Sequence, residues 1–467
     1  MPWDDFVLKF PGIERPTGRV PFKTKLMWTG IILVSYYILA EIPIFGLTSE
    51  AVDYFAQLRA ILAGKFGSIM TLGIGPIVTA SILLQLMVGT RIVNWDMSNP
   101  YYRAKFQGWQ KMLAVIFIFV EAVPWVASGR LGGSATIARQ MGVSIGFLNT
   151  LIIFQLFLGG SMVLLMDEVV SKWGIGSGVG LFIAAGVCQE IVVGIFNPLP
   201  SKYTPNVPAG RLFSAIYYFN MGSPGNAVRA LIPIIGTVVT FLLVVYAETM
   251  RVEIPVSYGG IKGIRSRYPI RFVYASNIPV ILMGALLANF QMIGRMLADK
   301  GITIFGQIGS NGEPISGLLL YLSPPYQLIT HLVVGGYVSM TEIIQAVCYM
   351  SVMVLGSMAF AHFWIMTTGM GPSEIATRLQ SQGLQIPGFR KDRRILERVL
   401  SRYIPVVTLL GGAFVGFLAA FADFTGALGH GTGVLLTVGI LYRMYEQIAQ
   451  EQMMDVNPMI RRFIQGG

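Results

Sequence analysis

Side chains that commonly carry out catalysis or bind metals are few and dispersed in this sequence. Three histidines are present, His331, His362 and His430, and none has a metal-ligating partner at the i, i+4 spacing that places two side chains on one helix face. Two cysteines, Cys188 and Cys348, are too few for a four-cysteine metal site. The G-x-x-x-x-G-K-[ST] phosphate-binding motif does not occur. We therefore expect neither enzymatic activity nor a bound cofactor.

Two polar side chains lie inside long apolar runs and require an explanation. They are Glu121 and Asn289. An ionisable side chain near the centre of a bilayer costs at least about 2.5 kcal/mol on insertion scales. Each of the two could form a hydrogen bond between neighbouring helices or mark a functional site, and the residues alone leave both interpretations open.

Basic side chains concentrate in two polar segments, KGIRSR at Lys262–Arg267 and RKDRR at Arg390–Arg394. Membrane proteins carry excess Lys and Arg in cytoplasmic loops, and anionic lipid attracts such residues. A polyanion such as RNA binds them through counterion release. The composition does not decide between these partners.

The elements that hold these residues must lie in a membrane. The 467 residues are 54% hydrophobic and 12% charged, where a soluble domain carries about 25% charged residues. The mean hydropathy is +0.64. These values exclude a water-soluble protein.

Ten apolar runs are long enough to predict membrane-spanning helices. They fall at about 26–45, 70–89, 109–127, 147–168, 177–196, 230–249, 271–293, 341–368, 403–422 and 432–449. An eleventh run, 315–338, contains Pro324 and Pro325, and an additional crossing there would separate the seven basic residues of 378–402 from the other basic loops. We therefore expect ten spans, both termini in the cytoplasm, and a surface or re-entrant segment at 315–338.

Two sequence echoes suggest an internal repeat. EIPI at 41–44 ends the first run and EIPV at 253–256 ends the sixth, whereas Gly-rich stretches at 174–181 and 429–436 open the fifth and tenth. A repeat of five spans must insert with inverted orientation, because five is odd. The pattern predicts two inverted halves with any conduit at their interface.

Three short features have both a plain and a functional interpretation. Residues 54–66 form an amphipathic helix of about 20 Å, too short to cross a core of about 30 Å, so it lies on the membrane or enters a cavity. Ile74 and Val78 lie four residues apart, as do Ile183 and Val187. Such aliphatic pairs commonly pack in a core, and they could also line a pore.

Longer stretches resemble the SecY family of protein-conducting channels, in its archaeal and eukaryotic-like branch. The similar stretches are GIGPIVTASILLQL at 73–86, GIGSGVGLFIAAGV at 174–187, RYPIRFVYASNIPVIL at 267–282, IPGFRKDRR at 386–394 and GTGVLLTVGI at 431–440. The resemblance implies an all-α membrane protein with ten helices in two inverted five-helix halves around an hourglass pore. It further implies a function in passing secretory polypeptides across the membrane and releasing transmembrane segments laterally into lipid.

The resemblance also implies a role for individual residues. The expected pore ring is Ile74, Val78, Ile183, Val187, Ile281 and Leu436, and the expected lateral gate is Thr79, Glu121 and Asn289. The expected plug uses Tyr54, Leu58, Ile61, Leu62 and Phe66, and docking of the ribosome uses Lys262, Arg265, Arg390 and Lys391. Implied partners are small SecE-type and Sec-beta-type membrane subunits in a heterotrimer, the ribosome, signal peptides and nascent chains, and membrane lipids.

The expected organisation follows the chain in order within the cell membrane. It comprises a cytoplasmic segment 1–25, a first five-helix half 26–200 with a re-entrant plug helix at about 50–67, an external loop 201–229, a second half 230–452 with cytoplasmic basic loops at about 251–271 and 369–402, and a cytoplasmic tail 453–467. The alternative function is a secondary transporter, which also uses inverted repeats. A transporter should gather polar ligands at midmembrane, whereas the candidate waist here is aliphatic.

Overall fold

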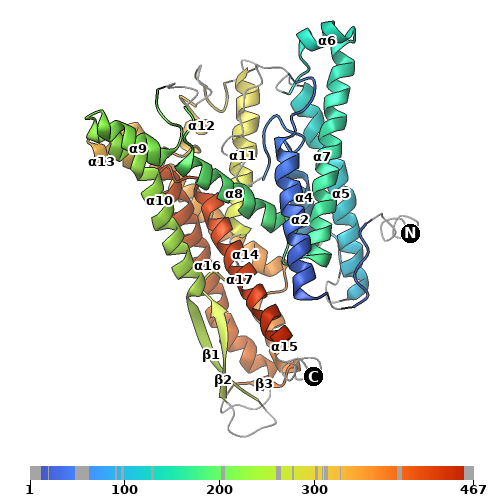
Figure 1. Ribbon diagram of the computed structural model, residues 1–467. Coiled ribbons are helices and arrows are strands. Elements are labelled where there is room, and N and C mark those ends of the chain that lie inside the picture. The colour runs from blue at the N-terminus through green and yellow to red at the C-terminus, as the bar shows by residue number, and fades with distance from the viewer. Residues whose placement is uncertain are drawn as a thin grey trace. The chain divides into compact units, whose positions relative to one another are not determined.

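The computed structural model confirms a mostly helical membrane protein. It describes residues 12–18, 20–47, 63–89, 92–95, 99–127, 131–200, 206–258, 265–275, 278–299, 303–307, 309, 314–326, 328–386 and 392–456. Each of the ten predicted runs overlaps one long helix. These are α2 (Phe22–Glu41), α4 (Gly75–Gly89), α5 (Pro100–Ala127), α7 (Ile145–Trp173), α8 (Gly178–Phe196), α10 (Pro224–Thr249), α11 (Ile278–Asp299), α14 (Met340–Thr367), α16 (Arg393–Phe424) and α17 (Gly431–Val456) (Figure 1).

Several of these helices are suited to cross a bilayer. Within the described residues, α5, α7, α8, α10, α14 and α16 are each long and apolar enough, and α4 and α11 contain shorter apolar segments. The remaining helices are short: α6 (Ala135–Met141), α9 (Arg211–Asn220), α12 (Leu318–Tyr321), α13 (Leu328–Val334) and α15 (Pro372–Ser381). Because α12 and α13 have four and seven residues, neither can span, as expected for 315–338. A surface or re-entrant location of this segment stays a prediction.

A small antiparallel sheet forms from the two segments expected to be basic loops, 251–271 and 369–402. It consists of β1 (Arg251–Tyr258), β2 (Arg265–Arg271) and β3 (Leu384–Gln385) in the order β2-β1-β3. The EIPV stretch lies inside β1, after α10 has ended at Thr249. The prediction that it ends the sixth span in parallel with EIPI is therefore wrong.

The chain divides into two compact units, which we describe separately. Unit 1 contains residues 1–187 and 440–467, and unit 2 contains residues 188–439. A core of unit 1 forms where α5 and α7 face each other, with Ile118 and Ile152 completely buried. Gly159 of α7 allows a close approach of the chain before α4, because a Cβ there would lie 2.0 Å from the Ile69 carbonyl oxygen.

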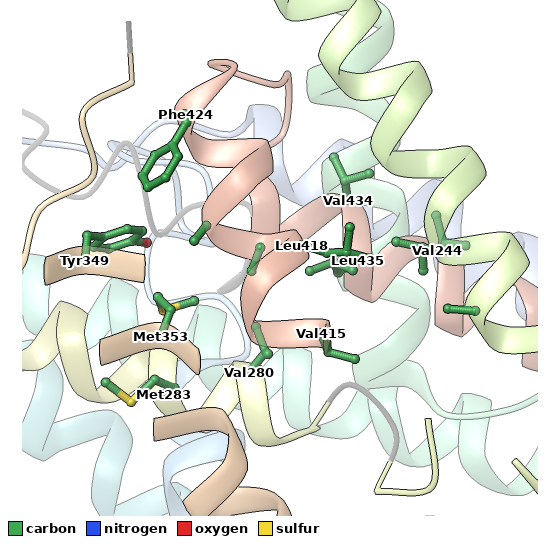
Figure 2. Close-up of a cluster of buried hydrophobic side chains, with 14 of the residues drawn as sticks. Val244, Val280, Met283, Tyr349, Met353, Val415, Leu418, Phe424, Val434 and Leu435 are labelled. Atoms are coloured by element: carbon green, nitrogen blue, oxygen red, sulfur yellow. The ribbon is translucent and has the colours of Figure 1, made fainter. Parts of the chain in front are cut away.

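The main core of unit 2 lies among α10, α11, α14, α16 and the first turns of α17. Figure 2 shows the apolar side chains of this cluster, with Met353 of α14 opposite Leu418 of α16. Gly412 and Gly416 of α16 bring the backbones of these two helices together, since a Cβ on Gly416 would lie 2.6 Å from the Met353 carbonyl oxygen. Small residues at this spacing are typical of closely packed membrane helices.

A second cluster in unit 2 supports the sheet. Ile254 of β1 and Ile270 of β2 are buried together with Ile375 of α15 and with Leu396 and Leu400 of α16. Alternate residues of the strands therefore face an apolar core. The described strand β2, which contains Arg265 and Arg267, is therefore held by this core.

Candidate functional site

The four aliphatic side chains expected at the pore in unit 1 occupy two helical regions. Ile74 is in the turn before α4, where its carbonyl oxygen accepts hydrogen bonds from the N–H groups of Ile77 and Val78. Ile183 and Val187 are one turn apart on α8. Ile74 and Val187 are fully buried and Ile183 is 4% exposed.

The two expected pore residues of unit 2 are Ile281 on α11, which is half-buried, and Leu436 on α17, which is buried. The start of α17 is fixed by Asp423 at the end of α16. Its Oδ1 accepts a hydrogen bond from the Gly431 N–H at 2.8 Å, and its Oδ2 accepts one from the Tyr349 hydroxyl at 2.8 Å. Sequence reasoning missed Asp423, although an acidic residue just before a Gly-rich helix start was a usable signal.

Because the six residues are divided between the two units, a ring formed by all of them stays a prediction.

Two of the three residues expected at the lateral gate contact each other. The Thr79 hydroxyl of α4 donates to the Gly75 carbonyl oxygen at 2.9 Å and lies 3.2 Å from Oε1 of Glu121 on α5. Glu121 is thus hydrogen-bonded between helices within unit 1, as the plain interpretation requires. The side chain of Asn289 lies outside the described residues.

The last residues of the expected plug helix, 63–66, are described and are not helical, so the prediction of a helix that continues to Phe66 is wrong; they lie against α2 and the chain that follows it. The Tyr36 hydroxyl donates to the Ala63 carbonyl oxygen at 2.7 Å, and the Ile44 N–H donates to the Gly67 carbonyl oxygen at 2.8 Å. Phe66 packs against the unit 1 core, with its ring centroid 6.4 Å from that of Trp125. The other expected plug residues, Tyr54, Leu58, Ile61 and Leu62, lie outside the described residues.

The sheet places β2, which contains Arg265, and β3, which precedes the second basic segment in the sequence, on either side of β1. Ser257 of β1 pairs with Arg265 on one side and with Gln385 on the other. With neighbouring strands about 4.8 Å apart, the backbones of Arg265 and Gln385 are about 10 Å from each other although they are far apart in the sequence. The side chain of Arg265 and all of Lys262, Arg390 and Lys391 lie outside the described residues.

Three basic side chains in or next to the two basic segments are described. Arg267 is bonded to Glu253 at 2.6 Å, and this hydrogen bond, together with the charge of Glu253, raises the pKa of Arg267 above its usual value. Arg393 and Arg394 begin α16 and are exposed. Arg267 is therefore partly neutralised, whereas Arg394 is available to a polyanion.

Comparison with protein-family models gives two adjacent matches. Residues 68–445 match the SecY family, and residues 34–67 match the plug domain of Sec61p. Together they cover most of the chain. The second match includes the segment expected to be the plug.

Curated relatives are similar over nearly their whole length. The protein translocase subunit SecY of Methanothermobacter thermautotrophicus is 50% identical over 458 residues, which are 97% of this chain and 96% of the relative. The subunit of the same name from Archaeoglobus fulgidus is 44% identical over 481 residues, covering 98% and 97%.

Solved structures show the same fold. A protein-conducting channel matches with a TM-score of 0.81 and 44% identity over 97% of this chain and 98% of that chain. A SecY protein whose plug domain stabilises the closed channel and maintains a membrane seal has a TM-score of 0.79, with the same identity and coverage. Sec61 in a canine ribosome-channel complex has a TM-score of 0.78, again at 44% identity over 97% and 98% of the two chains. On this full-length similarity of sequence and fold, the chain belongs to the SecY family of protein-conducting channels.

Proposed function

We propose that this chain is the central pore-forming subunit of a protein translocation channel in the cell membrane. It passes secretory polypeptides across the bilayer and releases transmembrane segments laterally into lipid. The observation that carries the proposal is the similarity to SecY subunits along nearly the entire chain. The alternative of a secondary transporter is not supported, because the relatives and solved structures that match are translocation channels.

The proposed closed channel is sealed by aliphatic side chains and a plug. Ile74, Val78, Ile183, Val187, Ile281 and Leu436 form the ring. A hydrophobic constriction excludes water and ions without imposing a hydrogen-bonding pattern on the polypeptide that passes. Residues 54–66 fill the outer half of the pore, and the contact between Ala63, near the end of this segment, and Tyr36 of α2 supports a segment that turns back to this helix.

Ion flux through the purified channel in proteoliposomes tests this seal. Replacing Ile74, Ile183 and Ile281 together with glycine should make the closed channel leaky, since a dry waist needs branched aliphatic bulk. Deleting residues 54–66 should also raise the leak. If the triple glycine variant instead loses stability at about 2–5 kcal/mol per position and does not leak, these side chains pack rather than seal.

The proposed lateral gate contains Thr79, Glu121 and Asn289. Replacing Asn289 with leucine removes an interhelical hydrogen bond of about 0.6–2 kcal/mol and should change how hydrophobic a segment must be to enter lipid. The measurement is the fraction of a graded series of model segments that inserts. An insertion threshold equal to that of the parent protein would reject a role of Asn289 in the gate.

The proposed partners are a SecE-type and a Sec-beta-type subunit, the ribosome, signal peptides and nascent chains, and membrane lipids. Both termini and the sheet lie on the cytoplasmic side, where an excess of basic residues is expected. Purification with native partners tests the assembly. Recovery of a tightly bound single-span subunit supports it, and its consistent absence under mild solubilisation contradicts it.

Docking of the ribosome is assigned to the tips that carry Lys262, Arg265, Arg390 and Lys391. Specific recognition predicts that Arg265→Glu and Arg390→Glu each abolish cosedimentation with ribosomes. The matched control is Arg378→Glu on α15, which should be tolerated. Over a salt series, equal losses for all three variants would indicate unspecific counterion release and defeat the assignment to the tips.

A further inference from the structure

A polar cavity of about 330 Å³ lies where α9 meets the first turns of α10 in unit 2. Figure 1 shows this place at the end of α10 opposite to β1 and β2. Arg211, Arg229, Tyr218 and Asn226 line it. Among its described lining residues none is acidic. The cavity therefore favours an anion.

The two arginines are available to bind such an anion. Both are exposed, and no described residue accepts a hydrogen bond from either guanidinium or forms an ion pair with it. A guanidinium presents five N–H donors in a planar fork that suits phosphate oxygens. The Tyr218 hydroxyl and the Asn226 amide add neutral donors at the same cavity.

The position of Arg229 along α10 indicates where the cavity lies relative to the membrane. From Arg229 to Thr249 the helix rises about 30 Å, which equals the thickness of the hydrocarbon core. Between Arg229 and Glu248 the sequence contains no charged residue. When α10 spans the bilayer, Arg229 thus lies at its boundary, where lipid phosphates are found.

The exposed face of α9 favours a lipid over a soluble anion as the ligand of this cavity. Phe213, Ile216 and Phe219 are 37%, 51% and 73% exposed and repeat every three residues, whereas Ser214 and Ala215 on the opposite face are buried. A short helix with an apolar face and basic residues beside it is typical of one that lies in the membrane interface.

We propose that Arg211 and Arg229 bind the phosphate of an anionic lipid headgroup, with the acyl chains lying along Phe213, Ile216 and Phe219. A cavity of this size accommodates a phosphoglycerol group and not the whole lipid. The assignment is independent of protein conduction, because it concerns the outer surface of unit 2.

Native mass spectrometry of the full chain tests the site with phosphatidylglycerol as the probe. We expect Arg211→Gln and Arg229→Gln each to weaken binding about fivefold, and both together about 25-fold, from the usual attraction per basic residue. Arg139→Gln, which changes an exposed arginine on α6, is the matched control and should leave binding unchanged. Equal binding by the double variant and the parent protein would overturn the proposal.

Two further measurements identify the source of the phosphate. Phosphatidylcholine should bind more weakly than phosphatidylglycerol, because no described lining residue is acidic and could pair with choline. Phe219→Ser should weaken binding of phosphatidylglycerol and leave binding of free glycerol phosphate unchanged. If glycerol phosphate binds as tightly as the lipid, or if both lipids bind equally, the site does not serve an anionic lipid.

Discussion

Asp423 should be one of the most sensitive single positions for the stability of unit 2. Its carboxylate links three helices, because it accepts hydrogen bonds from the Tyr349 hydroxyl of α14 and from the Gly431 N–H of α17, each at 2.8 Å. Asp423 and Tyr349 are both 5% exposed. Asp423→Ala leaves two buried donors without a partner, at about 1–3 kcal/mol each, so we expect a loss of about 2–6 kcal/mol.

A double-mutant cycle separates this network from simple loss of packing. Tyr349→Phe removes the hydroxyl that Asp423→Ala leaves unpaired, so the double variant should lose at least about 1 kcal/mol less than the sum of the single variants. The assay is thermal unfolding of the detergent-solubilised protein, calibrated by denaturant unfolding. Strictly additive losses would refute the proposed coupling.

A second readout connects Asp423 with the channel. The bond to Gly431 fixes the first turn of α17, and Leu436 lies on that helix. Asp423→Ala should therefore raise ion flux through the closed channel in proteoliposomes. Tyr349→Phe should raise it less, because the bond to Gly431 remains.

Two further substitutions, each compared with a control variant, test the packing of unit 1. The Glu168 side chain is 9% exposed and accepts hydrogen bonds from the ammonium groups of two lysines. Glu168→Gln should therefore lower the free energy of unfolding by about 1–3 kcal/mol. The control is Glu397→Gln, in an exposed pair at 3.8 Å, which should cost less than about 0.5 kcal/mol. Gly159→Ala would place a methyl group 2.0 Å from a carbonyl oxygen and should cost about 1–3 kcal/mol. At Gly30, in α2, a Cβ meets nothing within 4 Å, so alanine there should be neutral or stabilising. Equal stability of the Gly159 and Gly30 variants in thermal unfolding would contradict the close approach.

The ten helices could be predicted from the sequence because a span needs only a sufficient run of apolar residues, which is a local property. The sheet could not be predicted in the same way. Ser257 pairs with Gln385 across 128 residues, and β3 has two residues, too few for a pattern. Ile254 and Val256 of β1 do alternate with exposed residues, so the sequence of the first strand contained the alternating pattern that predicts a β-strand.

The site could be predicted in residue type more readily than in contacts. The motif that contains Thr79 indicated a polar position in α4, yet only the fold places its hydroxyl 3.2 Å from Glu121 of α5. The hydrogen-bond partners of Asp423 likewise cannot be read from the sequence, since Tyr349 lies 74 residues away. Helix pairing in three dimensions determines these contacts.

The Gly-rich echo at the starts of the fifth and tenth spans has a physical cause in the structure. In unit 1 the Asp167 carboxylate, near the end of α7, accepts a hydrogen bond from the Val179 N–H at 2.8 Å, as Asp423 does from Gly431 at the same distance. Gly178 adjoins this bond, and a Cβ there would lie 2.5 Å from the Asp167 Cα; one on Gly431 would lie 2.1 Å from a carbonyl oxygen of α16.

In each unit a helix therefore begins in contact with the end of the preceding helix, where only glycine fits and a carboxylate satisfies a free N–H group. A carboxylate at a helix N-terminus is also favoured by the helix dipole. The two connections fix the first turns of α8 and α17, the helices that carry Ile183, Val187 and Leu436. The proposed seal needs backbones that do not shift, and a carboxylate bonded to the start of the next helix would hold the backbone in this way in both units.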